Sequence, residues 1–181
     1  MAKPIRGVLL TALVLALYFG GRYLYFKPLH EGGDPAPPLR ATLLDGSAFD
    51  LTALHGEYVL LDFWGSWCGP CLQDYPKLVE LHKQYGSSGF DDAGGFEIVS
   101  IAIEEDVARW HKAIGLLDPP WSYQILDQTS SLRFFNGEIA EAYGVRQLPT
   151  KFLIGPEGQV IASDWSLVKI DKYLSQKVKR G

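Results

Sequence analysis

Residues 58–76 read Tyr58-Val-Leu-Leu-Asp-Phe-Trp-Gly-Ser-Trp-Cys-Gly-Pro-Cys-Leu-Gln-Asp-Tyr-Pro76, and the rest of the chain can be placed around them. The run 59–64 is apolar and β-prone, apart from Asp62. After two small residues, apolar side chains recur at helical spacings: Leu72, Tyr75, Leu78, Val79 and Leu81. The pattern predicts a strand followed by a helix, with Cys68 at the junction and Cys71 one turn into the helix.

This placement of Cys68 has chemical consequences. The first N–H groups of a helix lack intrahelical partners, and the helix dipole is positive there, so the pKa of the Cys68 thiol should fall. Pro70 suits the first turn, because its missing N–H would have no partner. The i, i+3 spacing puts both sulfurs on one face, close enough to bridge. We therefore interpret Cys68 as the attacking thiolate and Cys71 as the resolving thiol of a disulfide-exchange site.

Composition excludes several other classes of protein. The chain has 181 residues, a formal charge of -4 and two cysteines. The charge gives no reason to expect a nucleic acid partner, and two adjacent cysteines cannot form a disulfide-stapled scaffold. A CxxC pair could be half of a zinc site, but a tetrahedral site needs two more ligands, and the four histidines are scattered. We expect no metal, and no cofactor other than the Cys68–Cys71 disulfide itself.

The N-terminal part of the chain predicts a membrane anchor. Residues 1–6 are short and basic, and residues 7–26 supply the roughly 20 apolar positions of a spanning helix. A cleaved signal peptide is the alternative, but residues 18–21 match a cleavage site poorly. Flanking positive charges are nearly balanced and tip slightly towards a cytoplasmic N-terminus. Residues 27–38, rich in Gly and Pro, are expected to be a linker, and residues 39–181 a folded domain.

Strand-like and helix-like segments alternate through the rest of the chain. Short β-prone pieces at 42–44 and 48–51 flank a turn, and a turn of helix follows at 51–54. Later strands are expected at 96–103, 121–126, 151–154 and 159–162, and helices at 107–116, 131–143 and 166–179. Glu104, Glu105 and Asp106 are interpreted as acids at a helix start. The order predicts an α/β fold with a central mixed sheet flanked by helices on both faces.

Two segments carry a specific resemblance to the thioredoxin family. Residues 59–76 resemble its strand–motif–helix unit, and residues 143–154, Tyr-Gly-Val-Arg-Gln-Leu-Pro-Thr-Lys-Phe-Leu-Ile, resemble its cis-proline segment, with Pro149 as the matching proline. The anchor, the opening residues 37–56 and the inserted helix and strand at 107–126 resemble the membrane-tethered TlpA and ResA branch. The resemblance implies a thioredoxin fold with an N-terminal extension and an inserted helix–strand unit.

Two acidic residues depart from that branch, which often has Asn at position 62 and Glu at position 74. Asp62 lies in an apolar strand, where burial should raise its pKa and poise it to accept the proton of Cys71. The alternative is that strand alternation turns Asp62 outward. Asp74 is interpreted as a solvated helix acid, with a modulating role near the cysteines as the alternative.

Five residues are expected to line the substrate site. A cis bond at Pro149 would expose the backbone of Leu148 to an extended substrate, whereas an ordinary trans proline is the alternative. Trp67 is expected to offer an apolar surface beside Cys68. Gly69 and Pro70 resemble the residues between the cysteines of reducing members.

The sequence therefore predicts a membrane-anchored thiol–disulfide oxidoreductase. The resemblance implies a bacterial inner-membrane protein with its domain in the periplasm, which reduces proteins such as apocytochrome c or copper-site proteins. A membrane dithiol transporter would re-reduce it. The alternatives are a disulfide oxidant or isomerase, and a redox-inactive tethered binding module.

Overall fold

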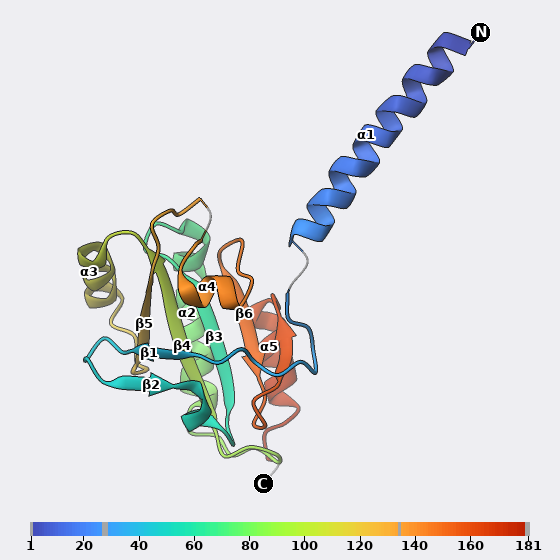
Figure 1. The fold of residues 1–181 in the computed structure, drawn as a ribbon. Helices are drawn as coiled ribbons and strands as arrows, with labels where there is room; N and C mark the ends of the chain where they lie inside the picture. The colour runs from blue at the N-terminus through green and yellow to red at the C-terminus, as the bar shows by residue number, and fades with distance from the viewer. Residues whose placement is uncertain (1, 27–28, 134, 180–181) are drawn as a thin grey trace.

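A five-stranded mixed sheet forms the centre of the computed structural model, which describes residues 2–26, 29–133 and 135–179. The strand order is β5-β4-β3-β6-β7. The bounds are Tyr58–Trp64 for β3, Phe96–Glu104 for β4, Tyr123–Gln128 for β5, Thr150–Ile154 for β6 and Val160–Ser163 for β7. β3, β4 and β5 are parallel, and β6 and β7 run antiparallel to their neighbours. This arrangement confirms the predicted mixed α/β fold (Figure 1).

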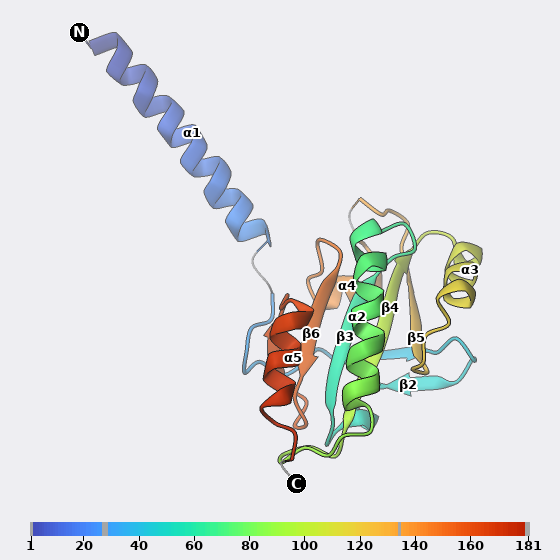
Figure 2. The same ribbon diagram turned by 180° about the vertical axis from the view of Figure 1, so that it is seen from behind.

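Both faces of the sheet are covered. One face packs against α2 (Gly69–Tyr85), α3 (Val107–Leu117) and α5 (Leu167–Ser175), which Figure 2 shows on the same side. The other face is covered by α4 (Glu138–Ala142), the hairpin of β1 (Arg40–Thr42) and β2 (Ala48–Asp50), and the 3₁₀ turn η1 (Leu51–Leu54). Side chains of β3 alternate between the two cores, as strand geometry requires.

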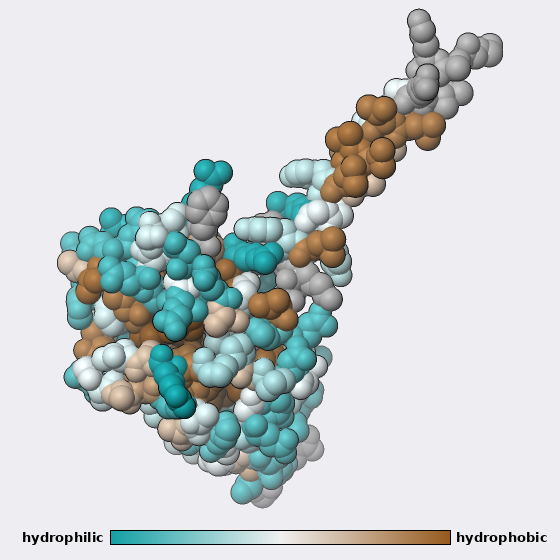
Figure 3. Space-filling view, viewed as in Figure 1, coloured by the Kyte–Doolittle hydropathy of each residue, from teal (hydrophilic) through white to brown (hydrophobic). Residues whose placement is uncertain are grey.

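The N-terminal helix α1 (Ala2–Phe26) projects away from the domain (Figure 1). Residues 7–25 are long and apolar enough to cross a membrane, with a mean hydropathy of 1.6, and none is buried against the rest of the protein. Figure 3 shows apolar residues gathered on this helix, while the visible face of the domain is largely hydrophilic. A signal sequence would have the same properties, so the helix is a candidate for either a membrane anchor or a signal.

The segment expected to be a free linker packs on the domain instead. Gly33 donates its N–H to the carbonyl of Val160 at 2.8 Å, and Ala36 donates to Gly158 at 2.9 Å. The ring of His30 lies 2.9 Å from the carbonyl of Ala142. Backbone pairing with the outer strand thus orders this segment despite its prolines and glycines; residues 27–28 lie outside the described residues.

Two expected helices are shorter than their sequence patterns suggest. The helix expected at 131–143 is only α4, which begins at Glu138 because the buried carboxylate of Asp127 accepts the N–H groups of Ile139 and Ala140 at 3.2 and 2.7 Å. Position 134 within this stretch is not described. The closing helix, expected at 166–179, ends at Ser175.

Candidate active site

The two cysteines lie at the N-terminus of α2, as predicted, and they form a disulfide with Cα atoms 5.3 Å apart. Cys68 is the N-cap, and its sulfur accepts the N–H of Cys71 at 3.3 Å. Pro70 occupies the first turn, where it removes no helical hydrogen bond. The sulfur of Cys68 therefore sits where helix donors favour negative charge.

The disulfide is almost enclosed by apolar side chains. Cys68 and Cys71 are each 5% exposed, in a cluster with Trp64, Trp110 and Ile114. Gly69 and Pro70, in contrast, are exposed. A substrate can therefore approach only along one edge of the disulfide, past the start of α2.

Trp67 forms one wall of this edge. The residue is 38% exposed, and its indole stacks on Phe135 with centroids 6.1 Å apart and donates Nε1–H to the carbonyl of Ile103 at 3.0 Å. A Cβ at Gly65 would lie 2.7 Å from Nε1, so only glycine allows this indole position. The indole of Trp67 is thus held in place by contacts that the sequence does not reveal.

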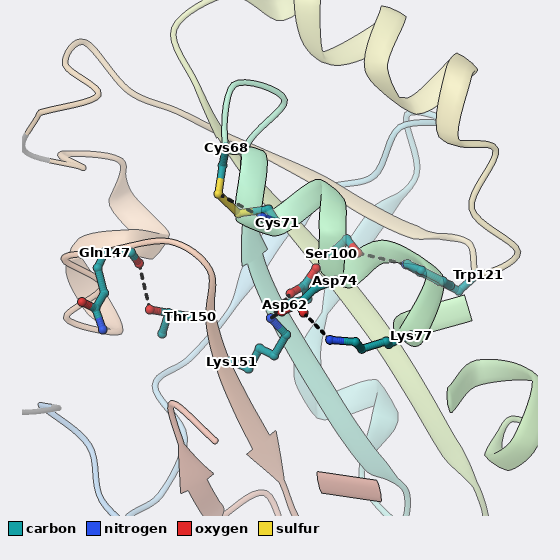
Figure 4. Close-up of polar contacts among 10 residues, drawn as sticks. All are labelled: Asp62, Cys68, Cys71, Asp74, Lys77, Ser100, Trp121, Gln147, Thr150 and Lys151. Carbon is teal, nitrogen blue, oxygen red and sulfur yellow. Dashed lines mark hydrogen bonds and ion pairs between the residues drawn. A yellow bond between two sulfur atoms is a disulfide. The ribbon is translucent and has the colours of Figure 1, made fainter. Parts of the chain in front are cut away.

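The opposite wall contains the proline loop. The Leu148–Pro149 peptide bond is cis, as the sequence predicts. Leu148 packs against the apolar cluster that holds both cysteines, and the Thr150 hydroxyl donates to the carbonyl of Gln147 at 2.8 Å. Figure 4 shows this loop facing Cys68 and Cys71.

Asp62 points towards α2, not outward. It is buried, and a cavity of about 10 Å³, which is about the space of one water molecule, is lined by Asp62, Cys71 and Ser100 among others. Burial raises the pKa of the Asp62 carboxyl, and the ammonium of Lys151 only partly opposes that rise. A carboxylate with a raised pKa therefore lies beside the cavity that Cys71 also lines.

Lys151 is the residue of this site that the sequence analysis missed. Register places it opposite Asp62 on β6, with its Nζ 3.4 Å from the Asp62 carboxylate and 3.0 Å from that of Asp74. Asp74 is therefore paired with a buried cation, so it is not the solvated helix acid that we expected. The available signal was a lysine in a run of strand residues, the same anomaly that marks Asp62.

Glu104 also differs from expectation. It is the buried last residue of β4, and its Oε1 accepts the N–H of Ser66 in the loop before Cys68, whereas Oε2 has no hydrogen-bond partner among the described residues. Asp106 is the helix cap, because it accepts the N–H groups of Ala108 and Arg109. Glu104 thus anchors the loop that carries Trp67 and Cys68.

We expect Glu104→Met to destabilise the oxidised protein by about 1–3 kcal/mol, because it leaves the N–H of Ser66 without an acceptor. Glu104→Gln keeps an acceptor oxygen and should cost less. Urea unfolding measures both, with Glu80→Met, at an exposed position of α2, as the control for loss of one charge. Equal losses for the Met and Gln variants would contradict the anchoring role.

Among the described residues, no group of three or more His, Cys, Asp and Glu side chains is placed to hold a metal ion. The groups that can react here are the Cys68–Cys71 disulfide and the buried carboxyl of Asp62, which lines the same cavity as Cys71. The arrangement can perform disulfide exchange with a proton acceptor close to the inner sulfur.

Comparison with known proteins agrees with this chemistry. The sequence model of the AhpC/TSA family matches residues 32–163. The thiol–disulfide oxidoreductase ResA of Bacillus subtilis is 32% identical over 160 residues, covering 85% of this chain and 77% of that protein. ResA of Geobacillus thermodenitrificans is 31% identical, covering 88% and 87%. The crystal structure of a putative thiol:disulfide interchange protein DsbE from Chlorobium tepidum matches with a TM-score of 0.63 at 28% identity, covering 81% and 94%.

Proposed function

Because the chain belongs to the AhpC/TSA family and is a thiol–disulfide oxidoreductase of the ResA type, we propose that it reduces disulfides of extracytoplasmic proteins through Cys68 and Cys71. The observation that carries this proposal is the Cys68–Cys71 disulfide at the start of α2, with buried Asp62 behind the inner cysteine. No further cofactor is part of the proposal.

In the reduced protein, the Cys68 thiolate attacks one sulfur of a substrate disulfide and releases the other as a thiolate. This gives a mixed disulfide between Cys68 and the substrate. Asp62 takes the proton of Cys71, whose thiolate then attacks the Cys68 sulfur. The second substrate thiolate leaves, and the two electrons of the dithiol have passed to the substrate. The disulfide in the structure is the oxidised end of this cycle.

Cys68 is the proposed attacking residue because its sulfur accepts a helix N–H and its neighbours Gly69 and Pro70 are exposed. Cys71 is the proposed resolving residue because it lines the Asp62 cavity. Trp67, Leu148 and Pro149 are proposed to contact the substrate along the accessible edge.

The charges near the inner sulfur favour the reducing direction. Strong oxidants of this chemistry have a stabilised reduced form. Here the carboxylates of Asp62 and Asp74 share one buried ammonium, that of Lys151, beside the cavity that Cys71 lines. This excess of negative charge disfavours a second thiolate, so it favours the disulfide form and lowers the reduction potential.

The apolar helix α1 supports a membrane tether. We propose that this membrane is the bacterial inner membrane, with residues 1–6 in the cytoplasm and the domain in the periplasm. We propose residues 7–26 as the anchor and a membrane dithiol transporter as the electron donor. Proteins such as apocytochrome c or copper-site proteins are the substrates that we propose, because the ResA resemblance implies them. Carbonate extraction and protease protection of tagged protein test the anchor: release into the soluble fraction as a shortened chain would mean a cleaved signal.

Full-length protein in detergent should accelerate the reduction of insulin by dithiothreitol, followed as turbidity. Equilibration with glutathione should give a reduction potential nearer to the about −270 mV of thioredoxin than to the about −120 mV of the strong periplasmic oxidants. A potential at the oxidising end would overturn the reductase assignment and favour an oxidant or isomerase. The Cys68→Ser/Cys71→Ser double variant is the matched control.

A further inference from the structure

Lys151 joins two carboxylates that come from different elements. Its side chain is 4% exposed, and its Nζ lies 3.4 Å from Oδ1 of Asp62 on β3 and 3.0 Å from Oδ2 of Asp74 on α2. Asp74 is 26% exposed and reaches the surface, where the exposed Lys77 lies 3.3 Å away. Figure 4 shows the carboxylates of Asp62 and Asp74 lying between the side chains of Lys151 and Lys77, beneath the disulfide.

An ammonium in this position is costly for the fold. A buried cation loses several kcal/mol of hydration, and a buried ion pair seldom recovers more than that loss. An apolar side chain at position 151 would fill the same space on β6 without this cost. The useful property of Lys151 is therefore electrostatic, and the group beside it is the carboxylate next to the Cys71 cavity.

We propose that Lys151 is a positioning residue for disulfide exchange: its ammonium favours the ionised form of the Asp62 carboxyl and connects that carboxyl to the partly exposed Asp74. The charge balance of Asp62, Lys151 and Asp74 then decides the pH range in which Cys71 becomes a nucleophile. This inference rests on the proposed roles of Asp62 and Cys71.

One further carboxylate lies beside Asp62, Lys151 and Asp74, the three residues that we call the triad. Asp164, at the end of β7, is a further carboxylate that interacts with Lys151, and its N–H donates to the Lys151 carbonyl at 2.7 Å. On the β4 and β5 side, the groups that line the cavity are Ser100 and Gln124, which do not titrate. From α2, the cavity is lined by Cys71 and Tyr75, whose hydroxyl donates to the Leu117 carbonyl.

Substitutions of Lys151 and Asp74 should shift the pH dependence of resolution by Cys71 in opposite directions. Lys151→Met removes the cation that favours the Asp62 carboxylate, so the pH at which resolution reaches half its maximal rate should rise by about 1–3 units. Asp74→Asn removes a like charge, so that pH should fall. Lys77→Met removes the same charge from a side chain that is 59% exposed, and solvent screening should leave the midpoint unchanged.

The experiment uses reduced full-length protein in detergent and dithiobis(nitrobenzoate) as the probe. Cys68 attack releases one nitrothiobenzoate at a rate that depends on probe concentration. Cys71 attack on the mixed disulfide then releases the second at a rate that does not, and stopped-flow absorbance resolves the two phases at each pH. The rate of the second phase, plotted against pH, gives the pH at which resolution is half-maximal for each variant.

The Asp62→Asn background separates this inference from the proposed function. In the Asp62→Asn variant, adding Lys151→Met should leave the pH dependence of the second phase unchanged, because the titrating carboxylate is gone. If Asp62→Asn leaves the second phase unchanged, the base assignment itself fails. If Asp62→Asn slows that phase but Lys151→Met does not move its midpoint, Lys151 is only structural. Should Lys151→Met not fold, as judged by urea unfolding, the Asp74→Asn shift decides: a fall supports the inference and no shift overturns it.

Discussion

A Cys71→Ser variant is expected to stop after the first exchange and to accumulate as a mixed disulfide with its substrate. The reason is positional: Cys71 lines the buried cavity with Asp62, and its sulfur is the one that would attack Cys68. Cys68→Ser should instead form no adduct, because it lacks the nucleophile. Both variants should lose insulin-reducing turnover by at least about 10⁴-fold, the scale seen when a catalytic nucleophile is removed.

Non-reducing electrophoresis of cells that express each variant measures the adducts, and the captured proteins identify the substrates. The Cys68→Ser chain, which has the same composition as the Cys71→Ser chain, is the matched control. Adducts on Cys68→Ser and none on Cys71→Ser would reverse the assigned order of the two cysteines. Equal adducts on both would indicate unselective oxidation.

An Asp62→Asn variant should be slower but more stable. Resolution by Cys71 should slow on the order of 100-fold, the lower end of what a positioned base contributes. Because burial raises the pKa of Asp62 in the folded state, the native protein binds this proton more tightly than the unfolded chain. The stability due to the bound proton is fully present below the unfolded pKa and is lost as pH rises through the raised, folded value.

Urea unfolding of the oxidised proteins across pH measures this second effect. The two proteins should be closest in stability at acidic pH, and the advantage of Asp62→Asn should grow as pH rises. A parallel pH dependence of both proteins would mean that the pKa of Asp62 is not raised. In that case the carboxyl would also lose its physical basis as an acceptor for the Cys71 proton.

Sequence reasoning succeeded where the signal is local. A β-prone run that stops at two small residues and a helical pattern that begins with Pro70 place Cys68 at a helix start, and the structure confirms this. It failed for Glu104, because an acid before a helix has the same local pattern whether it is exposed or buried at a strand end. It failed for the segment before Leu39, because pairing with a distant strand is invisible in a proline-rich composition.

The orientation of Asp62 shows the limit most directly. The two-residue period of a strand places neighbouring residues of β3 on opposite faces of the sheet, but it does not tell which face is exposed to solvent. In this protein both faces are covered. Spacing along the chain was therefore enough to identify the reactive sulfurs and their bridge, since the atoms involved lie within one helical turn. Only the tertiary structure brought Lys151 and Asp74 to Asp62, because sheet register and helix packing join residues far apart in the chain. The acidity of a buried carboxyl depends on the charges that packing places around it.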